Sequence, residues 1–210
     1  REIPAEALYG VQTLRGIENF SISKFRLSEY PLFIKGLAIT KMAAAMANFE
    51  LGLLTVEQKD AIIAACGEIL DGKHHDQFPV DMIQGGAGTT TNMNANEVIA
   101  NRALELMGHE RGEYQYCSPN DHVNCSQSTN DAYPTAIHIG MYFKHLQLLP
   151  HLEELIASFR KKGEEFSQII KMGRTQLEDA VPMTLGQTFN GFASILQDEI
   201  AHLNEAAADF

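Results

Sequence analysis

The chain has 210 residues, 45% of them hydrophobic, which is enough to bury a core in one large domain or two small ones. Its net charge of -11 and its lack of a basic run argue against a nucleic-acid partner. No apolar stretch approaches the length of a membrane span, and the first residues do not form a signal peptide. The sequence therefore predicts a cytoplasmic protein without a membrane partner, whose cysteines are free thiols: Cys66, Cys117 and Cys125.

The first part of the chain is expected to hold short elements and three helices. Residues 1–35 mix apolar residues with glycine and proline without a sustained period, which predicts irregular structure. Strong helix formers predict a helix at 37–51. Thr55 and Gln58 form a capping-box pattern that starts a second helix. A third helix is predicted at 93–107, where a glycine follows it.

Longer helices are expected after a polar loop at 118–131. One helix starts near Pro134 and continues to residue 170, and Pro150 can introduce a kink in it. A break at Gly173 predicts a polar turn, and apolar residues at three- and four-residue steps from Leu185 predict a second long helix. This last helix has no capping residue before the chain stops, which predicts a fragment of a longer protein.

These elements predict a mainly α fold. A small mixed or helical N-terminal domain is expected at residues 1–125, and the first part of a truncated, long helical bundle at 126–210.

Three polar segments could carry chemistry: residues 85–94, 126–131 and 173–179. Each is expected at a helix boundary, where backbone N–H groups lack intrahelical partners and hydroxyls and amides can add neutral donors for a carboxylate. Any one segment alone is better explained by helix caps and turns, which is the usual role of Ser and Thr at such places. The same donor-rich composition occurs three times, however, and this recurrence favours a binding site.

Other kinds of site are disfavoured. No Lys-Ser/Thr pair follows Gly88, as a phosphate-binding loop would require. Cys117, His122 and Cys125 lack a fourth ligand, so no metal site is predicted. His74 is expected in a solvated turn, and Met42 and Met46 are expected in the core. No side chain near the donor segments is an obvious general base.

Four separated motifs, in order, resemble the aspartase/fumarase superfamily, and the resemblance covers essentially the whole chain. Within this superfamily, Thr129 and Gln176 resemble the aspartase pattern. The fumarase pattern has serine at the position of Thr129 and histidine at the position of Gln176. A histidine also occurs at the second position in some aspartases, so a different ammonia-lyase or a hydratase stays open. The motifs are Gln84-Gly85-Gly86-Ala87-Gly88-Thr89, Pro119-Asn120-Asp121-His122-Val123-Asn124, Ser128-Thr129-Asn130-Asp131 and Gly173-Arg174-Thr175.

The resemblance implies elimination of ammonia from L-aspartate to give fumarate, without an organic cofactor. A divalent ion can modulate activity in this family, but no ligand set for it is found in the sequence. The resemblance also assigns the substrate contacts. Thr89, Ser128 and Thr129 would bind the carboxylate beside the carbon that loses its proton, and Asn130 and Thr175, with Gln176 as a further candidate, would contact the amino group.

The family's serine base and a substrate-binding lysine lie in a third motif that nothing in these 210 residues matches. The resemblance therefore implies that no catalytic base lies in this chain, and that the chain alone is inactive. It also implies self-association, because the family's active site is built from three subunits of a homotetramer. Two alternatives remain open: a fumarase-type hydratase that interconverts malate and fumarate, and a non-catalytic helical assembly protein.

Overall fold

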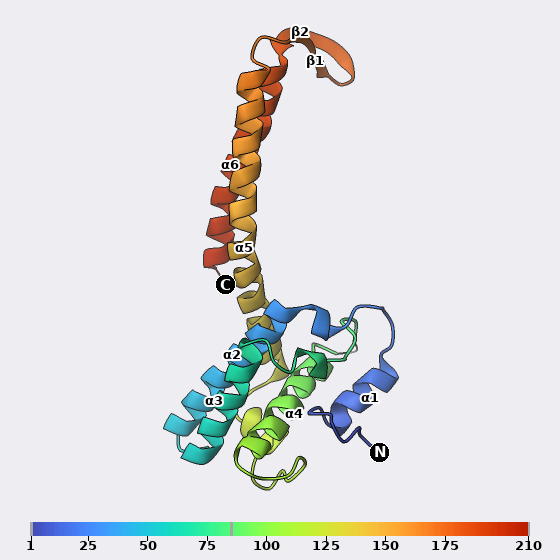
Figure 1. Ribbon diagram of the computed structural model, residues 1–210, viewed down its shortest axis with the longest axis vertical. Helices are drawn as coiled ribbons and strands as arrows, with labels where there is room; N and C mark the ends of the chain where they lie inside the picture. The colour runs from blue at the N-terminus through green and yellow to red at the C-terminus, as the bar shows by residue number, and fades with distance from the viewer. Residues whose placement is uncertain (1, 85, 210) are drawn as a thin grey trace. The chain divides into compact units, whose positions relative to one another are not determined.

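The computed structural model describes residues 2–84 and 86–209, and the chain divides into two compact units, residues 1–141 and 142–210 (Figure 1). Helix α5 (Thr129–Glu165) contributes its first turns to one unit and its remainder to the other. The elements are predominantly helices, which confirms the predicted mainly α fold. The predicted domain boundary at 125/126 falls inside the first unit and stays a prediction.

The first unit is built around three helices: α2 (Pro31–Glu50), α3 (Val56–Leu70) and α4 (Thr89–Leu106). Consecutive members of this set contact each other, and their facing sides form the core. Shorter elements surround them, namely α1 (Val11–Asn19), η1 (Leu27–Glu29), η2 (His75–Gln77) and the π-helical turn η3 (Pro119–Val123). The fully buried side chains of the core include Ile34, Leu37, Ile62, Ile69, Ile99 and Leu104.

Local signals set several helix ends. Thr55 and Gln58 form both hydrogen bonds of the predicted capping box, which confirms the start of α3. Gly52 follows α2 with a φ of 73°, a conformation that glycine adopts without steric cost. The start of α2 was predicted too late, because Pro31 supplies a favourable first helical residue that the irregular composition around it obscured.

Helix α2 differs from the sequence prediction in two respects. Its length and apolar composition would be sufficient to cross a membrane, contrary to the prediction that no stretch approaches that length. Ile34 and Leu37 are instead buried in the core of the first unit. Met42 packs against this core as predicted, but Met46 is 50% exposed because it lies on the outer face.

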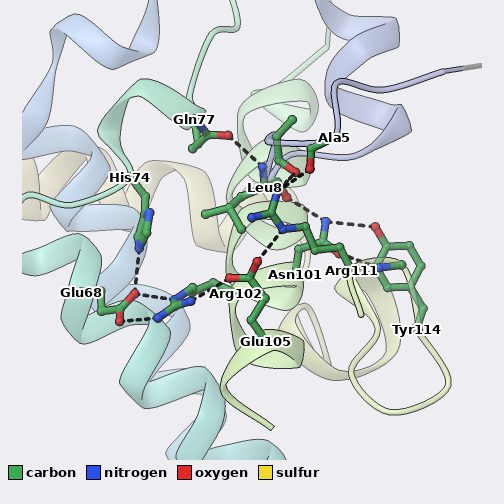
Figure 2. A network of polar contacts seen from close by, with 12 residues as sticks. Ala5, Leu8, Glu68, His74, Gln77, Asn101, Arg102, Glu105, Arg111 and Tyr114 are labelled. Carbon is green, nitrogen blue, oxygen red and sulfur yellow. Dashed lines mark hydrogen bonds and ion pairs between the residues drawn. The ribbon is translucent and has the colours of Figure 1, made fainter. Parts of the chain in front are cut away.

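An ion-pair network joins α3, α4 and the N-terminal segment (Figure 2). Glu68 binds both Arg102, at 2.6 Å, and His74, at 2.7 Å. Hydrogen bonds from Arg102 lower the pKa of Glu68 to about 2. Arg111 contacts Glu105 and donates to backbone carbonyls of the N-terminal segment. His74 lies in a turn, as predicted, but its ring is partly buried and belongs to this network.

The second unit consists of the rest of α5, a β-hairpin and α6 (Leu185–Ala208), and α5 and α6 lie side by side (Figure 1). Helix α5 continues without interruption through Pro150. The hairpin replaces the predicted polar turn: β1 (Ile170–Thr175) pairs antiparallel with β2 (Glu178–Thr184). The prediction failed because backbone pairing across the turn stabilises strands that have no alternating polar pattern.

Candidate functional site

The start of α4 and the start of α5 are held against each other. Gly88 precedes α4 with a φ of 85°, and a Cβ at this position would overlap the ring of Tyr133 in α5. The side-chain amide of Asn92 donates to the hydroxyl of Thr129 at 3.0 Å. Two of the three predicted polar segments are therefore adjacent in space, although they are separated along the chain.

Thr89 is the first residue of α4, four residues before the predicted start. The polar composition from Thr89 to Asn92 concealed this turn, because threonine and asparagine have low helix propensity. The side chain of Thr89 is exposed, and the first N–H groups of any helix lack intrahelical partners. The Thr91 N–H donates to the side-chain oxygen Oε1 of Gln84 at 3.0 Å.

Helix α5 begins at Thr129, five residues before the predicted start near Pro134. Ser128 is exposed, and its hydroxyl accepts from the Asn130 N–H at 3.1 Å. Ser128 therefore acts as a helix cap, which was the alternative explanation of this segment. Its hydroxyl hydrogen is still available for donation. Thr129 is half-buried and Asn130 is exposed.

Two hollows lie beside these helix starts. The larger, of about 500 Å³, lies between the loop before α4, with Gly88, and the start of α5, where Asn130 and Tyr133 line it. The smaller, of about 140 Å³, is lined by Thr89 together with residues of α1, including Arg15. Asn130 and Thr89 thus line separate hollows, and neither hollow is lined by Ser128 or Thr129. The motif residue Gly85 lies outside the described residues.

Thr175 and Gln176 belong to the second unit. Thr175 is the last residue of β1 and pairs with Glu178 of β2, so it lies in a hairpin and not at the predicted helix boundary. Gln176 and Leu177 form the two-residue turn, with φ values of 50° and 66°. Positive φ at residues other than glycine is sterically unfavourable and is found disproportionately at functional sites. Both predicted residues stay predictions.

A buried lysine contacts the turn before α5, and it was not predicted from the sequence. Lys41 of α2 is fully buried and donates to the side-chain oxygens of Asn124, at 2.9 Å, and Gln127, at 3.0 Å. Burial lowers the pKa of its ammonium group to about 7. The alanine-rich surroundings of Lys41 indicated only a helix, so no local signal could have shown that its amino group reaches the site.

Metal ligands are not gathered in the described part of the chain, where no group of three histidine, cysteine or acidic side chains could hold an ion. Cys117 is buried, and burial raises the pKa of its thiol to about 12. His122 Nδ1 accepts from the Ser118 N–H at 2.7 Å, and His122 Nε2 lies 3.2 Å from the side-chain nitrogen of Gln58. All three cysteines are free thiols, as predicted.

The comparisons with known proteins decide the family. A family model described as lyase matches residues 1–210, the whole chain. The chain belongs to this lyase family. Among the relatives of this lyase-family chain, the aspartate ammonia-lyase of Pseudomonas canavaninivorans is 58% identical over 208 residues, which are 99% of this chain and 44% of that protein.

Solved structures agree with this lyase assignment. The fumarate lyase:delta crystallin of Brucella melitensis is 54% identical with a TM-score of 0.94, over 99% of this chain and 45% of that one. The class II fumarase of Schistosoma mansoni is 40% identical with a TM-score of 0.83, over 95% of this chain and 42% of that one. The predicted resemblance to the aspartase/fumarase superfamily is confirmed. This lyase-family chain spans less than half the length of these relatives.

Proposed function

We propose that the complete protein is an aspartate ammonia-lyase, which eliminates ammonia from L-aspartate to give fumarate. The observation that carries this proposal is the 58% identity with an aspartate ammonia-lyase over 99% of the chain. The match covers 208 of the 210 residues, and the first two donor segments meet at the starts of α4 and α5.

The chemistry requires donors of this kind. Removal of a proton from the carbon beside an ionised carboxylate places a second negative charge on that group. Fixed hydroxyl donors and the positive end of a helix stabilise such a charge more strongly in the transition state than in the substrate. Ser128 and Thr129, at the start of α5, and Thr89, at the start of α4, are suited to this role.

The proposed acid–base chemistry depends on a serine base and a lysine outside this chain. Thr175, with Gln176, would contact the amino group from the hairpin, and Asn130 would do so from the first unit.

We further propose that the enzyme is a cytoplasmic homotetramer. Free thiols support a reducing compartment, and exposed apolar side chains on the hairpin and on α6, such as Val181 and Ile195, support self-association.

A fumarase-type hydratase is the second candidate, and the 40% identity with a class II fumarase favours it. The two activities differ in the leaving group, which is ammonia from aspartate and water from malate. The test is to purify the full-length protein and follow the ultraviolet absorbance of fumarate with each substrate. We expect turnover of aspartate; turnover of malate alone would reject the proposal, and no turnover of either would favour a non-catalytic assembly protein.

A further inference from the structure

We propose that Asn92 is a positioning residue that directs the hydroxyl hydrogen of Thr129 toward the substrate. Asn92 belongs to a series of hydrogen-bonded side chains that starts at Lys41 and ends at Thr129. This inference rests on the proposed function, because it takes Thr129 as a donor to a substrate carboxylate. It adds residues that the superfamily motifs do not point to as substrate contacts. Four side chains form this series: Lys41, Asn124, Asn92 and Thr129.

The orientation of Asn124 is fixed first. Its Nδ2 lies 3.0 Å from the backbone carbonyl of Gln127, which can only accept. The opposite atom, Oδ1, must therefore face the interior, where the ammonium group of Lys41 donates to it at 2.9 Å. The amide of Asn96 donates to the same oxygen at 3.2 Å.

The orientation of Asn92 follows from that of Asn124. Because an oxygen of Asn124 faces it, Asn92 must present its amino group, and Nδ2 lies 3.1 Å from Asn124 Oδ1. The same Nδ2 lies 3.0 Å from Thr129 Oγ1. The Oδ1 atom of Asn92 is buried and has no hydrogen-bond partner among the described residues, so rotating the amide would exchange good contacts for unfavourable ones.

The hydrogen bond from Asn92 determines how the hydroxyl of Thr129 is oriented. A hydroxyl has one hydrogen, and since its oxygen accepts from Asn92, that hydrogen is turned away from the interior. Thr129 is only half-buried, at the start of α5, so the hydrogen can point to a bound carboxylate. Donors fixed in this way need no reorganisation when charge develops in the transition state.

Asn92→Ala tests the inference in the full-length protein, and Asn94→Ala is its matched control. Asn94 lies on the same helix, is equally buried and also has a side-chain oxygen without a partner, but it donates to the backbone of Gln77. Asn92→Ala removes the hydrogen bonds to Asn124 and to Thr129, and it is expected to lower kcat about tenfold with a smaller change in KM, since only the neutral hydrogen bond to Thr129 acts on the substrate donor. Asn94→Ala is expected to lower the melting temperature while leaving kcat within about twofold.

A double-mutant cycle with Thr129→Val gives a readout that a purely structural role would not produce. Without the hydroxyl there is nothing to orient, so Asn92→Ala should cause no further loss of kcat in the Thr129→Val background. In a Thr129→Ser background, which keeps a hydroxyl, the dependence on Asn92 should persist. Additive losses in the valine background, or equal kinetic effects of Asn92→Ala and Asn94→Ala, would overturn the inference.

Asn92→Asp covers the case in which the alanine variant does not fold, because it preserves the shape of the side chain. An ionised carboxylate can only accept, so it would draw the Thr129 hydrogen inward. Activity relative to the parent protein should then fall as pH rises, and a flat ratio would contradict the inference. The parent protein is assayed on aspartate and malate alongside, so a failure of the proposed function shows in the parent and a failure of this inference only in the variants.

Discussion

At the scale of single residues, the most informative side chain is Lys41, whose amino group is buried where a positive charge is unfavourable. Lys41 is fully buried, and both of its side-chain acceptors, Asn124 and Gln127, are neutral amides. Among the described residues no carboxylate pairs with this ammonium group, and its burial opposes protonation, which accounts for its lowered pKa. The lysine stabilises the turn before α5 through hydrogen bonds and at the same time makes stability depend on pH.

Lys41→Met is predicted to remove part of that pH dependence. The pKa of Lys41 falls from its ordinary value of 10.5 to about 7 on folding, so the unfolded chain binds more protons between these values. Stability contributed by this residue therefore rises as pH increases from about 7 to 10.5, and the penalty is complete below about 7. The melting temperature measured at pH 7 and pH 9.5 should differ less in the variant. Lys35→Met, on the same helix, is the control and should keep the parent's difference.

At the scale of elements, the hairpin of the second unit is the least expected feature. Its turn places Gln176 and Leu177 at positive φ, where two-residue hairpins usually have asparagine or glycine. Leu177 is also 93% exposed. The positive φ values are unfavourable for residues other than glycine, and the exposed leucine gains no burial within the unit, so the turn does not contribute to the stability of the unit.

Leu177→Gly is predicted to raise the melting temperature of the isolated chain. Glycine adopts the observed φ of 66° without the steric cost of about 1 kcal/mol that a leucine incurs. Leu51→Gly is the matched control, since Leu51 is 72% exposed but has a φ of -81°. It should not raise the melting temperature. If Leu177→Gly lowered it, Leu177 would have to be packed against another surface.

At the scale of the whole molecule, the proposed function divides the site: we propose that this chain supplies donors for the substrate and that the serine base lies outside residues 1–210. Residues 1–210 expressed alone are therefore predicted to show no measurable turnover of aspartate, and the full-length protein is predicted to be active as a tetramer. Light scattering after gel filtration gives the mass, and the fumarate absorbance assay gives the activity. Turnover by residues 1–210 at a rate comparable with that of the full-length protein would place the base inside this chain.

Much of the fold could be predicted, because its signals are local. The capping box of Thr55 and Gln58 needs residues only three apart, and the helix that it starts was predicted correctly. The starts of α4 and α5 were predicted late, since Thr89 and Thr129 belong to polar segments that look like loops. The polar composition of these segments also marked them as candidate donor sites. The same composition therefore explains both the late helix starts and the choice of the candidate site.

The sequence by itself determined the helical class, the free thiols and the family, because each depends on local composition or on motifs that keep their order along the chain. Only the tertiary structure decided which donors meet and how they are oriented. The contact of Lys41 with Asn124 spans 83 residues, and that of Asn92 with Thr129 spans 37. Such contacts form when helices pack, and no pattern of neighbouring residues specifies which side chain a buried amide will face.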